Sequence, residues 1–274
     1  MPEVPPLNST ITRLLNRLGP YTLTPLPSDQ RTLYRVTTSS RDLVIKQHLS
    51  NADASGEVLA LTLLSKYIRV PHASRYENLV LTDFVDSTGS LRELLAPRSP
   101  AFALDQILTI AEYLLPTTEL TYSPAFFSRP ISIPALIARD ITRVFKTPHS
   151  REITRVLRDL STLALVSPPL RHGDLHPGNI LLTEPGLTLI DPHLTIGPLE
   201  ADLARLACSM YIFNALDLDL VISELSSAFH LSRRSLEIFT NAWLAQIYAY
   251  NYSQGAGSSP EALRTLAALT ERLS

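Results

Sequence analysis

The first third of the chain alternates between apolar and polar positions in a way that predicts short strands. Residues 31–38 and 43–48 show this alternation and are joined by a polar turn, so they predict two neighbouring strands. Residues 72–77 and 79–85 predict two more, and the helical run 54–68 lies between the two pairs. This part of the chain is therefore expected to form a small sheet with an accompanying helix.

Helical periodicity dominates the rest of the chain. From residue 101 to 166 apolar residues recur every three or four positions, interrupted by prolines, and a shorter helix is predicted from 8 to 18. Four more helices are predicted after the middle of the chain, at 199–212, 216–229, 232–250 and 260–273, the last capped by Ser259 with Pro260 at its first position. Strands followed by helices predict an α+β fold.

One hairpin stands apart from this helical pattern. Its apolar runs, 180–182 and 187–190, are separated by Glu184-Pro185-Gly186. Asp174 and Asn179 precede the first run, and Asp191 ends the second. The hairpin therefore predicts that three oxygen-bearing side chains lie at one edge of a small sheet.

These three side chains suit phosphoryl transfer. Asp174 can orient an attacking hydroxyl and accept its proton, whereas Asn179 and Asp191 offer the hard oxygens that Mg²⁺ prefers. The spacing of His172, Asp174 and Asn179 agrees with the kinase catalytic-loop pattern H-R-D-L-x-x-x-N, with Gly173 in place of the arginine. The absence of that arginine indicates a site that is not switched by phosphorylation.

Lys46 is a candidate for the nucleotide phosphates. It is one of only three lysines, and it lies in an apolar strand, where a buried ammonium group needs an anionic partner. In kinases that partner is the α/β-phosphate pair together with a helix glutamate, for which Glu57 in the run 54–68 is the candidate. The strand pattern alone leaves open that Lys46 points outward into solvent.

Composition narrows the class of protein. A hydrophobic fraction of 45% and a charged fraction of 18% are typical of a soluble globular chain, and the single cysteine excludes an internal disulfide and fits a reducing cytoplasm. The first residues have no signal-peptide pattern, and no uncharged run reaches the ~18–20 apolar residues of a membrane span. A net charge of −2 argues against nucleic acid as a partner. We expect a cytoplasmic protein without a membrane or nucleic-acid partner.

The charge is unevenly distributed. Residues 175–274 hold ten acidic residues and five arginines, a balance of −5, so residues 1–174 carry +3. An acidic second part would suit a cationic acceptor, but solvent-exposed acidic helix faces explain the same balance. Both interpretations stay open at this stage.

A family resemblance follows from these motifs. HGDLHPGNIL at 172–181, LIDP at 189–192 and GPLEADLA at 197–204 together closely resemble the aminoglycoside phosphotransferase family, a small-molecule branch of the kinase-like fold. The resemblance covers most of the chain. It implies a bilobal protein-kinase-like fold, with a β-rich nucleotide-binding N-lobe at 1–86 and a mainly helical C-lobe at 87–274 that carries the catalytic loop and the acceptor-binding helices.

The resemblance also implies cofactors and an acceptor. ATP would be the donor, Mg²⁺ the metal, and a hydroxyl of a small molecule the acceptor, with an aminoglycoside or another amino sugar as a candidate and antibiotic resistance as a candidate role. The residues around Ile190 to His193, with Gly197 and Pro198, are similar to the streptomycin-type phosphotransferases.

Further site residues are carried over from the same family. Backbone groups of Asp83, Phe84 and Val85 would hold adenine. The glycine-rich phosphate loop of the kinase fold is missing before residue 31, and the hydroxyl of Ser28 is the candidate phosphate contact in its place. Asp202 would brace the catalytic loop, and the histidine of that loop would act as a packing and hydrogen-bonding post.

Two alternatives remain. The first is a catalytically inactive kinase-like module that only binds nucleotide. The second is a metal enzyme, either an iron oxygenase using His172 and Asp174 with His193 or His230, or a zinc hydrolase using His172, Asp174 and His176. The metal enzymes would leave the predicted lysine, helix glutamate and magnesium ligands without roles.

Overall fold

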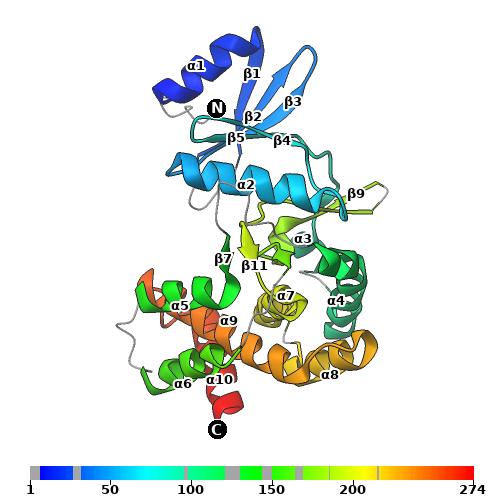
Figure 1. Cartoon of the computed structure of the whole chain (residues 1–274), viewed down its shortest axis with the longest axis vertical. Coiled ribbons are helices and arrows are strands. Elements are labelled where there is room, and N and C mark those ends of the chain that lie inside the picture. Colours follow the sequence, from blue (N-terminus) through cyan, green and yellow to red (C-terminus); the bar gives the residue numbers. More distant parts are fainter. Residues whose placement is uncertain are drawn as a thin grey trace.

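The structure is a computed structural model that describes residues 7–26, 32–95, 98–120, 130–143, 150–163, 169–184, 186–214 and 216–274. A β-rich region and a mainly helical region follow one another along the chain and lie at opposite ends of the molecule (Figure 1). This arrangement confirms the predicted α+β class.

Five antiparallel strands form the sheet of the β-rich region, in the spatial order β1-β2-β3-β5-β4. The elements of this region are α1 (Ser9–Leu18), β1 (Tyr21–Pro25), β2 (Leu33–Thr38), β3 (Asp42–Gln47), α2 (Asn51–Leu64), β4 (Ala73–Tyr76) and β5 (Leu79–Asp83). The sequence pattern did not predict β1. It is an edge strand whose residues are mostly exposed, so it lacks the apolar alternation that marks a half-buried strand.

The two faces of β3 have different neighbours, because successive side chains of a strand point to opposite faces. Leu43 and Ile45 belong to the apolar cluster formed with the buried face of α1. Lys46 points to the other face, where α2 packs against β4 and β5. The sheet thus separates an apolar layer from a face that carries charged groups.

Capping residues decide where the first helices begin. Asn8 caps α1, its side chain accepting a hydrogen bond from the backbone N–H of Ile11 at 2.8 Å. Ser50 does the same for α2, accepting from the N–H of Asp53 at 3.1 Å. The helix predicted at 54–68 therefore begins three residues earlier than its apolar pattern indicated.

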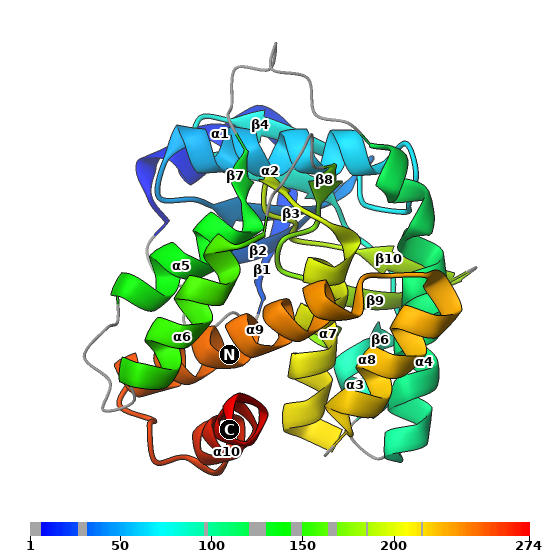
Figure 2. The same cartoon turned by 60° about the horizontal axis from the view of Figure 1, so that its bottom comes forward.

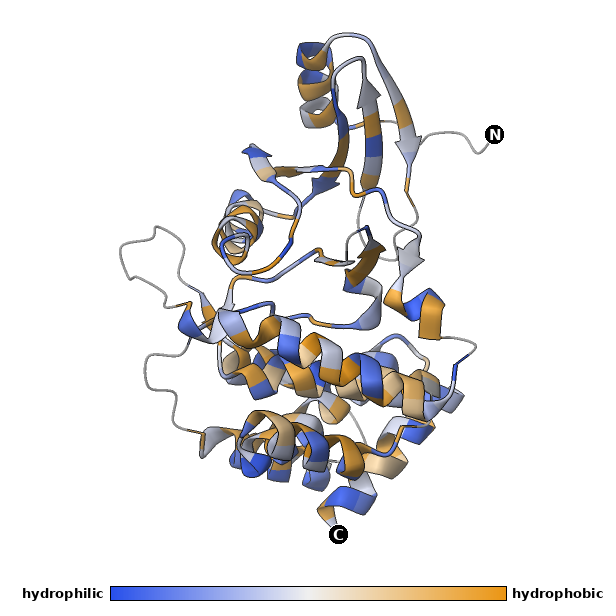
Figure 3. Ribbon diagram, turned by 90° about the vertical axis from the view of Figure 1, so that its right-hand side faces the viewer, coloured by the Kyte–Doolittle hydropathy of each residue, from blue (hydrophilic) through white to orange (hydrophobic). Residues whose placement is uncertain are grey.

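The helical region is built around α9, which lies across its middle and contacts five other helices (Figure 2). Its helices are α3 (Leu91–Leu95), α4 (Pro100–Leu114), the 3-10 helix η1 (Leu115–Glu119), α5 (Ile133–Arg143), α6 (Ser150–Ser161), α7 (Leu199–Asn214), α8 (Leu218–Phe229), α9 (Arg233–Ser253) and α10 (Pro260–Leu273). Apolar and polar residues alternate around these helices (Figure 3), and the apolar sides meet in one large core. None of the described helices combines the length and apolar character needed to cross a bilayer.

Two small sheets join the two regions. One has the order β10-β9-β6, made of β6 (Gly89–Ser90), β9 (Ile180–Thr183) and β10 (Gly186–Leu189), and it contains the predicted hairpin. The other has the order β7-β11-β8, made of β7 (Ile131–Ser132), β8 (Leu170–Arg171) and β11 (Thr195–Ile196). The segment with the kinase-like motif runs from β8 through the 3-10 helix η2 (Pro177–Asn179) into β9. The lobe boundary after residue 86 stays a prediction.

Candidate active site

Asp202 of α7 holds the backbone of the loop that follows β8. Its carboxylate accepts hydrogen bonds from the backbone N–H groups of His172 and Gly173, each at 2.9 Å. Asp202 is 2% exposed, so water does not compete for these bonds. The predicted bracing role of Asp202 is confirmed.

The ring of His172 connects the segment of Asp174 to the segment of Asp191. Its Nε2 donates to the carbonyl oxygen of Ile190 at 3.0 Å, and its Nδ1 accepts from the backbone N–H of Asp174 at 3.4 Å. Both contacts require the neutral tautomer with its proton on Nε2. Burial lowers the pKa of His172, in keeping with a neutral ring. His172 is therefore a hydrogen-bonding post, as the sequence predicted.

Asp174 lies at the accessible end of this loop, with a side chain that is 27% exposed. Its Oδ1 lies 3.2 Å from Nη2 of Arg205, and its Oδ2 lies 3.7 Å from Nε2 of His176. Burial raises the pKa of Asp174, but Arg205 and the neighbouring histidines lower it more strongly, to about 2. Asp174 is thus ionised at neutral pH and able to accept a hydrogen bond from a hydroxyl group.

His176 caps η2 and lies next to Asp174 with a single tautomer of its ring. Its Nδ1 accepts a hydrogen bond from the backbone N–H of Gly178 at 3.1 Å, so the proton of the neutral ring resides on Nε2. Burial lowers the pKa of His176 to about 4, although the charge of Asp174 opposes this shift. At neutral pH the ring therefore carries no charge.

The two predicted metal ligands belong to the two segments that the His172 ring connects, since Asn179 bonds to Asp174 and Asp191 follows Ile190. Asn179 is 7% exposed, and its Nδ2 donates to the carbonyl oxygen of Asp174 at 3.0 Å, so Oδ1 is the side-chain atom that a metal would use. Asp191 follows β10 with a φ of +57°, in the left-handed region that is uncommon for residues other than glycine. Its side chain is 35% exposed. Strained backbone of this kind is concentrated at functional sites.

Lys46 meets two carboxylates that come from distant parts of the chain. Its Nζ lies 2.7 Å from Oε2 of Glu57 on α2, and it also pairs with Oδ1 of Asp191. The side chains of Lys46 and Glu57 are 8% and 6% exposed, so the open alternative of an outward-pointing Lys46 is excluded. The predicted pairing of Lys46 with Glu57 is present, and Asp191 joins it.

The segment predicted to hold adenine, residues 83–85, already uses two of its backbone N–H groups in hydrogen bonds to neighbouring backbone. The backbone N–H of Asp83 donates to the carbonyl of His72 at 3.0 Å, and that of Phe84 donates to the carbonyl of Asp42 at 2.8 Å. Contacts of this segment with adenine would therefore use its carbonyl oxygens and the backbone of Val85. Ser28 lies outside the described residues.

Two site residues were missed by the sequence analysis. His48 is buried, with Nε2 2.7 Å from Oε2 of Glu57, so the same carboxylate oxygen has both Lys46 and His48 as neighbours. The alternation along β3, which puts residues 46 and 48 on one face, could have revealed it. Arg205 could have been found because it lies one helical turn after Asp202.

The alternative metal sites find no support in the described part of the chain. No group of three or more His, Cys, Asp or Glu side chains there is arranged to hold a metal ion. A magnesium site built from Asn179 and Asp191 has a different donor set, with one amide and one carboxylate oxygen.

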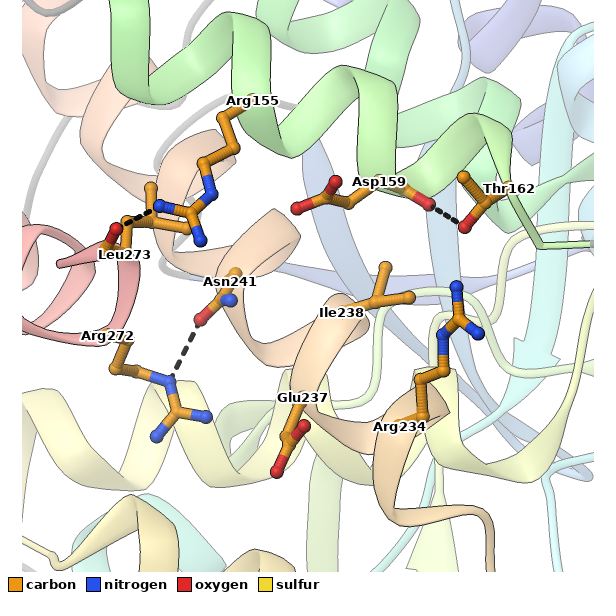
Figure 4. A pocket seen from close by; sticks show the side chains of 9 residues that line it. All are labelled: Arg155, Asp159, Thr162, Arg234, Glu237, Ile238, Asn241, Arg272 and Leu273. Carbon is orange, nitrogen blue, oxygen red and sulfur yellow. Dashed lines mark hydrogen bonds between the residues drawn. The ribbon is translucent and has the colours of Figure 1, made fainter.

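A separate pocket of about 280 Å³ lies between α6, α9 and α10 (Figure 4). Its lining residues are Arg155, Asp159, Thr162, Arg234, Glu237, Ile238, Asn241, Arg272 and Leu273. Arg155 donates to the carbonyl of Leu273, and Arg272 donates to Oδ1 of Asn241 at 2.9 Å, so these two arginines join α10 to its neighbours. None of the predicted site residues lines this pocket.

The chain matches no known protein-family pattern and no curated protein sequence. Solved structures do match it over nearly its whole length. A thermostable mutant of the aminoglycoside phosphotransferase APH(4)-Ia, in a ternary complex with ADP and hygromycin B, has a TM-score of 0.64 at 12% identity and covers 97% of this chain and 98% of its own.

Two other matches come from related groups. A choline/ethanolamine kinase family protein from Mesorhizobium loti has a TM-score of 0.60 at 16% identity, covering 92% of this chain and 88% of its own. A candidate fructosamine-3-kinase from Haemophilus somnus 129PT has a TM-score of 0.64 at 14% identity, covering 97% of both chains. At these identities the likeness shows the fold, while the streptomycin-type branch stays a prediction. The chain has the kinase-like fold of small-molecule phosphotransferases.

Proposed function

We propose that the protein is an ATP-dependent O-phosphotransferase that moves the γ-phosphate to a hydroxyl of a small molecule. The observation that carries this proposal is the convergence around His172. Lys46 and Glu57 meet Asp191 on one side of this ring, and Asp174 lies on the other with its carboxylate accessible. These are the groups that phosphoryl transfer needs for holding phosphates, binding a metal and orienting an acceptor.

The donor set fits a magnesium–nucleotide pair. One carboxylate and one amide oxygen, from Asp191 and Asn179, are hard ligands that leave room for water and phosphate oxygens. Lys46, fixed by Glu57, supplies a buried cation that would hold the α- and β-phosphates. When bound, ATP would supply the transferable phosphoryl group, and Mg²⁺ would neutralise negative charge on the phosphates. The present contact between Lys46 and Asp191 would open to admit them.

Asp174 would orient the acceptor. A carboxylate with a pKa of about 2 is ionised but weakly basic, so its main contribution is to align the hydroxyl and to accept the proton late in the reaction. Such a role suits the loose transition state of phosphoryl transfer, in which the attacking oxygen carries little bond order. His176, which is neutral at pH 7, adds no positive charge that would repel a cationic acceptor.

The identity of the acceptor is the open part of the proposal. The structural neighbours are named as kinases of aminoglycosides, of choline or ethanolamine, and of fructosamine. The acidic second part of the chain favours a cationic acceptor. The positive charge of Arg205 next to Asp174 disfavours one. Aminoglycosides, amino sugars and small metabolic alcohols are therefore all worth screening.

The direct test is consumption of ATP, coupled to detection of ADP, over this panel of acceptors with and without Mg²⁺. Asp174→Asn keeps the size of the side chain but removes its charge and proton-accepting capacity. General-base and orienting catalysis is worth roughly 10²–10⁴-fold, so we expect a loss of that order in turnover. Asp105→Asn, the same change at an exposed position of α4, is the matched control and should keep full turnover.

Two outcomes would overturn the proposal. Unchanged, acceptor-dependent ATP consumption in Asp174→Asn would remove Asp174 from the mechanism. Magnesium-dependent nucleotide binding without turnover on any acceptor would instead favour the inactive binding module.

A further inference from the structure

Arg205 of α7 makes a specific contact with the carboxylate of Asp174. Its Nη2 and Nε lie 3.2 Å and 3.4 Å from the same oxygen, Oδ1. Its side chain is 17% exposed, so the contact is partly shielded from solvent. The other carboxylate oxygen, Oδ2, lies 3.7 Å from Nε2 of His176.

The guanidinium group is itself held in place. Nη1 of Arg205 lies 3.3 Å from the hydroxyl of Ser209, one turn further along α7. Its central carbon lies over the Trp243 ring of α9, 5.2 Å from the ring centroid and within the range of a cation–π contact. Trp243 is fixed in turn, because its Nε1 donates to the carbonyl of Ala201 at 2.8 Å. The cation therefore has little freedom to leave Asp174.

One face of α7 thus holds both the backbone and the Asp174 side chain of the loop after β8. Asp202, Arg205 and Ser209 are spaced three and four residues apart, which puts them on the same side of the helix. Asp202 holds the backbone before Asp174, while Arg205 holds its side chain. Backbone and carboxylate are fixed by the same rigid element.

We propose that Arg205 is a positioning residue for phosphoryl transfer, holding Oδ1 of Asp174 so that Oδ2 is presented to the acceptor hydroxyl. The inference rests on the function proposed above. Rotation about the last torsion of an aspartate is soft, so a free carboxylate samples many orientations. A planar, preorganised guanidinium restricts this rotation in a way that a flexible ammonium group does not.

The experiment compares Arg205→Ala, Arg205→Lys and the parent protein. Turnover is measured with an acceptor found by the screen or, where none is found, as magnesium-dependent hydrolysis of ATP by water. A misplacement of about 1 Å can cost 10²-fold in rate, so Arg205→Ala should lose roughly 10–100-fold in kcat with little change in KM for ATP. Arg205→Lys should recover only part of this loss. Guanidinium ion at low, non-denaturing concentration should partly restore Arg205→Ala.

Arg264→Ala is the matched control. This arginine of α10 donates to the carbonyl of Ile212 on α7 at 2.7 Å, so it ties another helix to α7 without touching Asp174. Its loss should lower thermal stability but leave kcat unchanged and insensitive to guanidinium. Arg205→Ala with unaltered kcat would overturn the positioning role. So would a loss of kcat that guanidinium does not restore and that follows the melting temperature as in Arg264→Ala.

Asp174→Asn separates failure of this inference from failure of the proposed function. If the parent protein turns over ATP, Asp174→Asn is impaired and Arg205→Ala is not, only the role of Arg205 is wrong. If Asp174→Asn matches the parent protein, the proposed function itself fails. Guanidinium should not restore Asp174→Asn in either case.

Discussion

Gly173 combines two constraints that no other residue satisfies. Its φ is +76°, in the left-handed region. A Cβ at this position would lie 2.3 Å from the hydroxyl oxygen and 2.7 Å from the methyl carbon of Thr195. Thr195 is fully buried in β11, so it has no room to move aside. The loop after β8 can thus approach β11 this closely only with glycine.

Gly173→Ala should therefore lower the free energy of unfolding more than backbone conformation alone explains. The left-handed conformation costs an alanine roughly 1–2 kcal/mol, and the clash with Thr195 adds to this. Gly255→Ala is the matched control, since Gly255 has a φ of +74° and no atom within 4 Å of an added Cβ. Urea denaturation measures both changes. Equal losses in the two variants would contradict the steric argument.

At this scale the sequence identifies motif residues better than their partners. Asp174, Asn179 and Asp191 are recognisable because their spacing follows a known chemical pattern. The need for glycine at 173 depends on Thr195 of another strand. The contact of Arg205 with Asp174 depends on how α7 packs against the loop. Tertiary contacts of this kind leave no local pattern in the sequence.

Arg171 shows how a very short element can be held by one side chain. It belongs to the two-residue strand β8 and is 2% exposed. Its Nε donates to the carbonyl of Gly197 at 2.9 Å, and its Nη1 donates to the carbonyl and hydroxyl oxygens of Thr117 at 3.2 Å and 2.9 Å. These bonds join β8, which directly precedes the loop of His172 to Asp174, to η1 and to the turn after β11.

Arg171→Met should destabilise the fold while preserving much of the buried volume. Hydrogen bonds to a charged group contribute about 1.5–3 kcal/mol each, and their loss leaves buried carbonyl groups unpaired, so we expect a loss on the order of 3 kcal/mol. The free energy of unfolding in urea provides the measurement. Arg41→Met, at an exposed position between β2 and β3, should change it by less than about 0.5 kcal/mol. A similarly small change at Arg171 would show that its bonds are dispensable.

Elements with a strong period could be predicted, whereas short ones could not. Helices α7 to α10 and the hairpin of β9 and β10 follow from apolar spacing, turn residues and caps. The strands β6, β7, β8 and β11 have two residues each, too few to show any alternation. They form because backbone groups brought together by the helices pair with one another.

The whole molecule depends on contacts between its β-rich and helical regions. On one side Lys46 of β3 pairs with Asp191, which follows β10. On another the backbone N–H of Leu189 in β10 donates to the carbonyl of Arg69, which follows α2, at 3.0 Å. A bound magnesium–nucleotide would replace the pairing of Lys46 with Asp191. Nucleotide binding should therefore change the melting temperature of the whole protein.

ADP should therefore raise the melting temperature strongly only when Mg²⁺ is present. A ligand at 100 times its dissociation constant stabilises the folded state by about 2.7 kcal/mol, a shift of several degrees for a chain of this size. Asp191→Asn should lose the magnesium dependence, because an amide is a poorer metal ligand than a carboxylate and no longer pairs with Lys46. Asp105→Asn on α4 should respond like the parent protein. Differential scanning calorimetry with ADP, with and without Mg²⁺, tests all three proteins. The same shift with and without Mg²⁺ in the parent protein, or an unaltered magnesium dependence in Asp191→Asn, would contradict the role of Asp191 as a metal ligand. Either result would also contradict the claim that nucleotide binding replaces the contact between Lys46 and Asp191.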